Sequence, residues 1–571
     1  MSPDRAGAAA RRVVLPLAAV LFVTVAILLP PEIHPWSGAA ATALLGAAVV
    51  LAFAATDGAQ APAWLGLPVA LGVLPVLAAS CRAHALDEAA YVLSLLLAGL
   101  AGGALARDER WRGALLRLLA GLGAAVALHA WVQALVIYPV LAGAIRAADP
   151  ADPSGVLVRL EAGRPSGPFS LPAALGGFIA LTLPLVAAAA LKGTRPRRRA
   201  AAAIVAVLLI SALLLARSIG ALLSGAAGIL CLVPLLPARR RVAAAAGLVL
   251  ALAAGAVLFA ATRHDVRGAA GADPLTLRAG NWRAAVVMIA GRPVLGVGPG
   301  AFATHYPRHV RPGMNESRHA HNSYLEAAAG WGLWILTPIG VLVAAVAGAL
   351  RRSWRAALTS APCDPALPVL AGGVAFLVHN LGDFTACLPG VALPAAMLLG
   401  LGLGMDRGRR DGVARVTRSP ASWWRPLRVA GAAILAALLT QHAVAAARVA
   451  GLLDRAADAV GRGDFDAASG PVREAMRLRP GDPAPPAFLA QMVLARFMEV
   501  PAARARGEAA ATRAVALDPE SAVLHHTRAL YHEAAGERAA AWCEQAEARR
   551  LYPLKERYAA PASPPPAGEL R

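Results

Sequence analysis

The stretch SLPAALGGFIALTLPLVAAAAL, residues 170–191, contains no charged side chain. An α-helix rises about 1.5 Å per residue, so about 20 such residues cross the hydrocarbon core of a bilayer. Similar apolar blocks recur along all 571 residues, of which 58% are hydrophobic. Soluble domains contain about 45–50% apolar residues. The pattern therefore predicts an all-α, polytopic helical membrane protein with about 12 or 13 spans.

Hydropathy places the candidate spans between short polar loops. They are 13–30, 38–56, 63–81, 88–106, 113–143, 170–191, 200–216, 220–237, 242–262, 324–350, 366–382, 386–405 and 427–447. Because many similar segments follow the first, we interpret it as a span rather than as a cleaved signal peptide.

Basic residues gather in the loops between spans. The formal net charge is +21, but short clusters of Lys and Arg beside apolar blocks orient membrane helices, so nucleic acid is not an expected partner. If the chain crosses the membrane thirteen times, the densest basic clusters all fall in loops on the same side, which is the cytoplasmic side. They are 107–112, 192–199, 238–241, 351–355 and 406–428. This predicts a cytoplasmic N-terminus and a C-terminal region on the outer side.

One loop on the predicted outer side, residues 263–323, has an unusual charge. It contains eight arginines, five histidines and no lysine, against three acidic residues. Cationic loops normally stay on the cytoplasmic side. Arginine suits bidentate recognition of phosphate, so this loop is the candidate site. A solvated loop in an arginine-favouring composition is the alternative interpretation.

The end of this loop, HNSYLE at 321–326, predicts a helix start. Ser323 and Glu326 have the spacing of a capping box, and His321 then lies just outside the helix. The positive end of a helix dipole disfavours imidazolium, and a neutral imidazole is suited to act as a general base. The alternative is that His321 or Asn322 only caps the helix.

Two other segments of the loop have local patterns. Residues 278–290 carry apolar side chains at helical spacing, which predicts an amphipathic helix on the membrane surface with Trp282 as its interfacial anchor. The apolar positions are Trp282, Ala285, Val286 and Ile289. The glycines between 296 and 300 lack the spacing of a phosphate-binding fingerprint, and we interpret them as turn formers.

The order of these motifs resembles the O-antigen ligase family of bacterial membrane glycosyltransferases, over about residues 160–405. The matching loop residues are Arg278, Trp282, Pro293, Gly296, Gly298, Tyr306, Pro307, Ala320, His321, Asn322, Tyr324 and Leu325. Upstream, 163–185 and 213–225 are similar to the family's Arg-x-x-Gly-x-Phe segment and its Ser-Arg-Gly-Ala turn. Downstream, 377–404 is similar to its closing His-x-x-x-Asp-Phe pair of spans.

The resemblance implies transfer of a glycan from an undecaprenyl-diphosphate carrier to an acceptor hydroxyl at the periplasmic face of the bacterial inner membrane. It implies no metal and no cofactor. His321 would be the base that deprotonates the acceptor, and Arg278 would stabilise the diphosphate leaving group. The family usually has arginine where this chain has Ile219. Either Arg217, from the same turn, or Arg164 would then supply the second phosphate contact.

Further residues are candidates for smaller roles. Arg318 is a third candidate for phosphate, and Asn322 and Tyr324 are expected to support the site. Asp383 falls at an outer span end, where an acid is a functional candidate, and His379 lies one helical turn before it. His305, His309 and His319 lack the cysteines or HExxH motif typical of zinc sites, and the five cysteines are scattered.

The region after the last span has a different composition. Segments ending at Pro480, Pro519 and Pro553 follow one another at 39 and 34 residues. A 34-residue period resembles the tetratricopeptide repeat, whose usual role is protein binding. We assign 451–558 to such helical repeats and expect 559–571 to be a disordered tail. The remaining residues, 1–450, form the transmembrane transferase domain.

The acceptor is open at this stage. A lipid A core sugar would make the protein a ligase, another lipid-linked glycan a polymerase, and a protein an O-oligosaccharyltransferase. The repeats mildly favour a protein partner or acceptor. The alternatives from other classes are a transporter for polysaccharide or polyprenyl lipid and a non-enzymatic scaffold. Transport predicts internal symmetry and charged helices at mid-membrane, which the sequence lacks.

Overall fold

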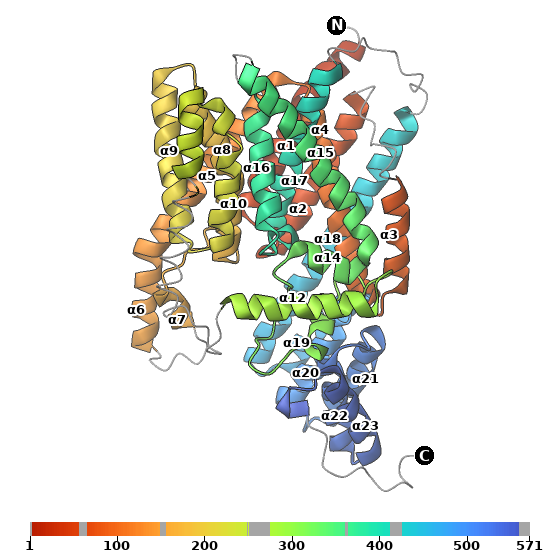
Figure 1. The fold of residues 1–571 in the computed structure, drawn as a ribbon. Coiled ribbons are helices and arrows are strands. Elements are labelled where there is room, and N and C mark those ends of the chain that lie inside the picture. The colour runs from red at the N-terminus through yellow and green to blue at the C-terminus, as the bar shows by residue number, and fades with distance from the viewer. Residues whose placement is uncertain are drawn as a thin grey trace. The chain divides into compact units, whose positions relative to one another are not determined.

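The computed structural model describes residues 3–55, 66–148, 156–247, 249, 274–359, 364–411 and 425–558. Within these ranges every regular element is helical and no strand occurs (Figure 1). The predicted all-α class is confirmed. The chain divides into two compact units. The first comprises Met1–Ala61, Leu93–Asp265 and Ile339–Thr440, and the second Pro62–Val92, Val266–Pro338 and Gln441–Arg571.

Eight helical segments in the described residues are long and apolar enough to cross a membrane, as a polytopic membrane protein requires. They are Pro35–Ala54, Arg82–Leu105, Glu109–Ala148, Pro172–Lys192, Pro196–Leu215, Leu333–Thr359, Pro389–Arg409 and Pro426–Gly461. Shorter apolar helices cover Val14–Leu28, Ile219–Leu235 and Ala366–His379. The predicted span 242–262 lies mostly outside the described residues, and the predicted tail 559–571 lies wholly outside them.

The first unit is built around α8 (Pro172–Lys192). Pro172 opens this helix at a position that needs no amide hydrogen. Figure 1 shows α8 beside its neighbours α5 (Glu109–Val132), α9 (Pro196–Leu215) and α10 (Ile219–Leu230). It also contacts α16 (Ala366–His379). Small residues permit this close packing: a Cβ at Gly176 would lie 2.5 Å from the Cβ of Ala221.

The other helices of the first unit complete the bundle. They are α1 (Pro3–Leu28), α2 (Pro35–Ala55), α6 (Tyr138–Ala148), α7 (Val156–Glu161) and α17 (Pro389–Asp411). Three helices contribute residues to both units, namely α4 (Arg82–Leu105), α15 (Leu336–Thr359) and α18 (Arg425–Gly461). Helix α18 is continuous past residue 447, where its span was predicted to end.

The second unit contains the candidate loop and the C-terminal helices. Its helices are α3 (Gly66–Ala78), α12 (Pro274–Gly291), α13 (Phe302–His305), α14 (Ser323–Trp331), α19 (Phe465–Leu478), α20 (Ala484–Arg496), α21 (Pro501–Leu517), α22 (Ala522–Ala535) and α23 (Arg538–Leu551). From α19 to α21, consecutive helices pack on one another around a core that includes Val472 and Val493, and α22 packs on α21 and α23. The buried Tyr531 hydroxyl donates to the Ala490 carbonyl at 2.7 Å. The C-terminal region is thus helical, and its assignment to tetratricopeptide repeats stays a prediction.

The predicted span 324–350 is not one helix. Helix α14 ends at Trp331, Gly332 follows with φ +91°, and the long apolar helix begins beyond it. A Cβ at Gly332 would lie 2.0 Å from the Val294 carbonyl oxygen, so only glycine fits this close approach. The continuous apolar composition of the stretch concealed the break.

Candidate functional site

The turn that begins α14 holds His321 in an unusual conformation. Among the described residues, only His321 (φ +53°) and Arg217 (φ +48°) are non-glycine residues with positive φ. Such conformations are uncommon for residues with a Cβ and gather at functional sites. Both residues had been predicted, on other grounds, to belong to the site.

Asn322, rather than Ser323, caps α14. Its side-chain oxygen accepts hydrogen bonds from the backbone N–H groups of Tyr324 and Leu325, both at 3.0 Å. Ser323 is the first helical residue and is buried. The predicted helix start is confirmed, but the predicted cap is wrong by one residue. The shift follows from the left-handed turn at His321, because Asn322 then has the extended backbone of a cap residue.

Glu326 contacts the residues that precede His321. Its carboxylate accepts a hydrogen bond from the Ala320 N–H at 2.9 Å and lies 2.8 Å from Nδ1 of His319. It therefore braces the residues before His321, while Asn322 braces those after it. His319 contacts a carboxylate within the turn, so it has a different environment from His321.

Helix α12 supports the same turn. The indole N–H of Trp282 donates to the His321 carbonyl at 3.1 Å. Arg278 precedes Trp282 by four residues, so the two share one face of α12; both are partly buried. The predicted helix is confirmed. Of its predicted apolar positions, Ala285 is buried and Val286 is 52% exposed. The buried positions are Asn281, Ala284, Ala285 and Met288.

The glycine segment packs against the end of α14. Gly296, Gly298 and Gly300 all have positive φ, which confirms their interpretation as turn formers. The N–H of Val297 donates to the Ala329 carbonyl at 2.8 Å, and that of Gly298 donates to the Gly330 carbonyl at 3.1 Å. These bonds fix the far end of α14, just as Asn322 fixes its start.

A buried tyrosine organises the remainder of the loop. The Tyr306 hydroxyl lies 2.7 Å from Oδ1 of Asn281 and 3.0 Å from the Asn315 carbonyl oxygen. Burial raises the pKa of Tyr306 to about 12, so its hydroxyl stays protonated and available as a donor. It links the segment before His321 to α12.

His305 is buried beside this tyrosine and is 2% exposed. Burial lowers its pKa to about 3, and the positive charges of Arg308, Arg292 and His309 act in the same direction. Its Nε2 has no hydrogen-bond partner within the described residues. His305 is consequently neutral in the folded loop at physiological pH.

Because His305 is buried and neutral, we expect the folded loop to lose stability at acidic pH. A histidine whose pKa is lowered by folding contributes no penalty above its unfolded pKa of about 6.5, and it destabilises the fold as the pH falls below that value. The slope is at most about 1.4 kcal/mol per pH unit. We expect the thermal midpoint of the purified protein to fall between about pH 6.5 and 4, and His305→Gln to flatten that fall. Equal slopes for both proteins would contradict this account.

In the first unit, Arg164 and Arg217 lie side by side. The guanidinium of Arg164 donates to the carbonyls of Ala216 (3.3 Å) and Arg217 (3.4 Å). That of Arg217 donates to the Ala162 carbonyl at 3.3 Å. The two arginines proposed from sequence as alternatives thus occupy one corner, and Ser218 caps α10 beside them. Ile219 is the first residue of that helix.

His379 and Asp383 also lie together in the first unit, and both are buried. Nε2 of His379 is 3.9 Å from the Asp383 carboxylate, which is beyond hydrogen-bond distance. Ser224 of α10 lies 3.4 Å from the other ring nitrogen. A Cβ at Gly177 would lie 3.0 Å from the ring. The predicted proximity of these two residues is confirmed.

Two predicted residues remain. Arg318 is exposed next to the His321 turn. Tyr324 is in the first turn of α14, and burial raises its pKa to about 12, so it also stays protonated. Five predicted residues therefore lie in the second unit and four in the first. Those in the second unit are Arg278, Arg318, His321, Asn322 and Tyr324; those in the first are Arg164, Arg217, His379 and Asp383.

A comparison with protein families found one match, which includes this loop. Residues 204–339 match the O-antigen ligase family. The matched segment contains Arg217, α12, the glycine turns and the start of α14, so it carries both residues with left-handed backbone. A comparison with curated proteins found no match for the chain. The match supports a membrane ligase that resembles glycosyltransferases.

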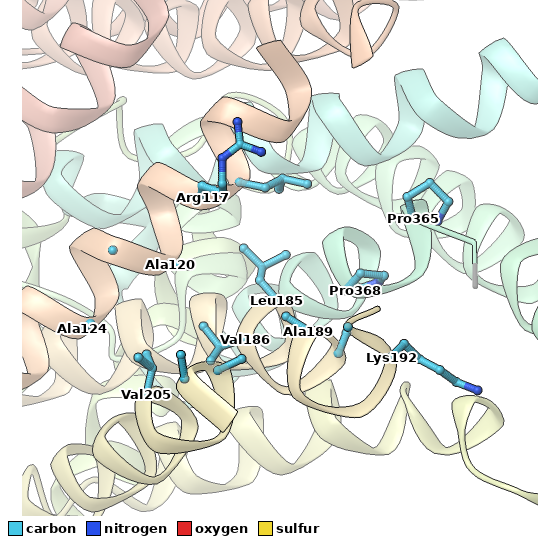
Figure 2. A pocket seen from close by; sticks show the side chains of 16 residues that line it. Arg117, Ala120, Ala124, Leu185, Val186, Ala189, Lys192, Val205, Pro365 and Pro368 are labelled. Carbon is cyan, nitrogen blue, oxygen red and sulfur yellow. The ribbon is translucent and has the colours of Figure 1, made fainter. Parts of the chain in front are cut away.

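A cavity of about 510 Å³ lies within the first unit (Figure 2). Its walls come from α5, α8, α9 and the start of α16. They are mostly apolar, and Arg117 and Lys192 supply the charged groups. None of the nine predicted site residues lines it. The polar surface of the O-antigen ligase segment, rather than this cavity, is the candidate site.

Three features of the loop were not found from sequence. Glu326 accepts a hydrogen bond from the Ala320 N–H, before the helix, and the Trp282 indole donates one to the His321 carbonyl. The third is a set of contacts to the C-terminal helices. Arg308 pairs with Glu520, and Glu316 contacts both Lys555 and the Tyr552 hydroxyl. Only the Ser-x-x-Glu spacing of Ser323 and Glu326 gave any sequence signal for these features.

Proposed function

We propose that the protein transfers a glycan from an undecaprenyl-diphosphate carrier to an acceptor hydroxyl. The observation that carries this proposal is the left-handed His321 at the start of α14, within the segment that matches the O-antigen ligase family. A strained backbone is retained where it orients a reacting group. Asn322, Glu326 and Trp282 surround this residue with hydrogen bonds.

In the proposed reaction, an imidazole nitrogen of His321 accepts the proton of the acceptor hydroxyl. The acceptor oxygen forms a bond to the anomeric carbon, and the bond from that carbon to the diphosphate oxygen breaks. The leaving diphosphate gains negative charge, which Arg278 stabilises, with Arg164, Arg217 and Arg318 as further cations. Asn322 and Tyr324, with His379 and Asp383, have supporting roles. The transfer step requires no metal.

The proposed location is the periplasmic face of the bacterial inner membrane. It is supported by the alternation of basic loops along the sequence, which leaves the His321 loop and the C-terminal helices outside. Cys543 is exposed in α23 and gives a direct test. A membrane-impermeant maleimide applied to intact spheroplasts should label wild-type protein at this residue, and protection of Cys543 until the membrane is permeabilised would reverse the orientation.

The acceptor is proposed to be presented through the C-terminal helices. Arg308 and Glu316, on the loop that precedes His321, form ion pairs with Glu520 and Lys555 of the C-terminal helices. These contacts support a role for the repeats beside the chemistry, which favours a protein acceptor or partner. A lipid A core sugar and a second lipid-linked glycan are the other two acceptors to be tested.

The experiment that tests this function is reconstitution. The purified protein in proteoliposomes receives undecaprenyl-diphosphate-linked glycan and, in separate reactions, a lipid A core, excess donor alone or periplasmic protein. We expect glycan to appear on one acceptor with stoichiometric release of undecaprenyl diphosphate. Consumption of donor without any acceptor product, or no consumption with all three acceptors, would contradict the proposal.

A further inference from the structure

Three metal-ligating side chains meet in the second unit, away from the loop that holds His321. They are Cys81, His84 and Asp518. The sulfur, a ring nitrogen and a carboxylate oxygen all lie within 4.8 Å of one another. Neither the sequence motifs nor the O-antigen ligase match, which covers 204–339, accounts for this cluster.

The local structure explains how distant residues meet. Cys81 directly precedes α4, and His84 lies three residues later in the first turn, so both side chains are on one face. Burial raises the pKa of the Cys81 thiol to about 11, and hydrogen bonds from the backbone N–H groups of His84 and Ala83 act in the opposite direction. Coordination to a metal ion would deprotonate the thiol. Asp518 is the residue after α21, and its backbone N–H bonds to the Ala514 carbonyl.

The cluster is buried, and two of its polar atoms have no hydrogen-bond partner among the described residues. Cys81 is 3% exposed and Asp518 is 4% exposed. Nδ1 of His84 and Oδ1 of Asp518 are buried and have no hydrogen-bond partner among the described residues. Burying polar atoms without partners is costly, and a bound cation would satisfy both. The adjacent His525 is not a further ligand, because its two ring nitrogens contact Glu544 and the Pro519 carbonyl.

We propose that Cys81, His84 and Asp518 bind a zinc ion. Thiolate, imidazole and carboxylate are the ligands that Zn²⁺ takes in proteins, and three protein ligands leave a fourth position for water. The sulfur excludes Mg²⁺ and Ca²⁺, which prefer oxygen ligands, and the carboxylate is a poor ligand for Cu⁺. The positive charge of Arg308, which is paired with Glu520, also acts on Asp518.

The ion connects two helices of the second unit. It joins the first turn of α4 to the C-terminal end of α21, two parts of the second unit that are far apart in sequence. A second set of contacts reinforces this junction: Asp87, on the next turn of α4, contacts Arg479 at 2.6 Å and His442 at 2.7 Å. The zinc thus fixes the helical repeats to the start of a membrane helix, and the inference is independent of the proposed glycan transfer.

The test measures metal in untagged, full-length protein purified in detergent. After dialysis against zinc and then against buffer, mass spectrometry should find about one zinc per chain. Cys81→Ser and Asp518→Asn should each lower zinc to background. The matched controls Cys543→Ser and Asp466→Asn change exposed residues of the same types and should retain it. Cobalt in place of zinc should give a thiolate charge-transfer absorption that Cys81→Ser removes.

Two results would overturn the proposal. One is wild-type protein without zinc after dialysis, and the other is zinc retained at the wild-type level by Cys81→Ser. A chelator should lower the thermal midpoint of wild-type protein and leave that of Asp518→Asn unchanged. Because this substitution preserves side-chain shape, a normal gel-filtration profile with lost zinc separates loss of the metal from misfolding.

Discussion

Replacement of His321 by alanine is expected to lower the rate of glycan transfer by about 10²–10⁴-fold, the usual contribution of a general base. The acceptor hydroxyl would then lose its proton to water alone. In reconstituted vesicles the loss should appear in kcat, with little change in the concentration of lipid-linked donor that half-saturates the protein. In cells, surface glycan resolved on a gel should fall while the membrane level of the protein stays constant.

The left-handed backbone at residue 321 requires a matched control. Alanine is strained at φ +53°, so His321→Ala changes both the imidazole and the stability of the turn. Asparagine tolerates this conformation and cannot act as a base. His321→Asn should therefore be as inactive as alanine but retain wild-type thermal stability. Full activity in the asparagine variant would remove His321 from the proposed chemistry.

Replacement of Arg278 by lysine is expected to lower kcat/KM for the donor by about 10–100-fold. Lysine keeps the positive charge but loses the planar fork that binds two phosphate oxygens together. Most of this loss should appear in kcat if the arginine contacts the leaving diphosphate more strongly as charge develops. The measurement is initial-rate kinetics with purified undecaprenyl-diphosphate glycan.

Arg283 supplies the control for this substitution. It lies on the same helix, α12, and is exposed. Arg283→Lys should retain kcat/KM within about twofold, since surface substitutions away from a site have small effects. Equal losses in the Arg278 and Arg283 variants would show that the loss is not specific to Arg278, and full activity of Arg278→Lys would exclude bidentate binding there.

Features set by neighbouring residues were predictable from sequence. The apolar blocks gave the helical membrane class because the bilayer fixes how long a span must be. The helix start near 323, the helix that contains 278–290 and the approach of His379 to Asp383 follow from spacing along one helix. Each depends on contacts within about one turn, which composition and periodicity describe directly.

Features set by distant contacts were not predictable. Gly332 breaks an apolar run because the Val294 carbonyl approaches it, and nothing around residue 332 signals that. The buried face of α12 includes Ala284, Ala285 and Met288. Because this helix is rich in alanine, its hydrophobicity pattern does not indicate which face is buried. Asn322, and not Ser323, caps α14 because His321, the residue before it, has a left-handed backbone conformation.

The arginine corner shows the same limit at the site itself. Arg164 and Arg217 were alternatives because the sequence places them more than 50 residues apart; the folded chain brings them to one corner, where each holds the backbone of the other's segment. The sequence predicts both arginines as site residues but does not predict their adjacency.

Because both guanidinium groups already rest against backbone carbonyls, their rotamers are restricted before any ligand arrives. An unrestrained arginine loses up to about 2 kcal/mol of conformational entropy when it is immobilised. At this corner much of that loss occurs during folding, because the backbone contacts of both guanidinium groups form as the chain folds. An anion that met this corner would bind with a smaller entropic penalty than the same charges on free side chains would impose.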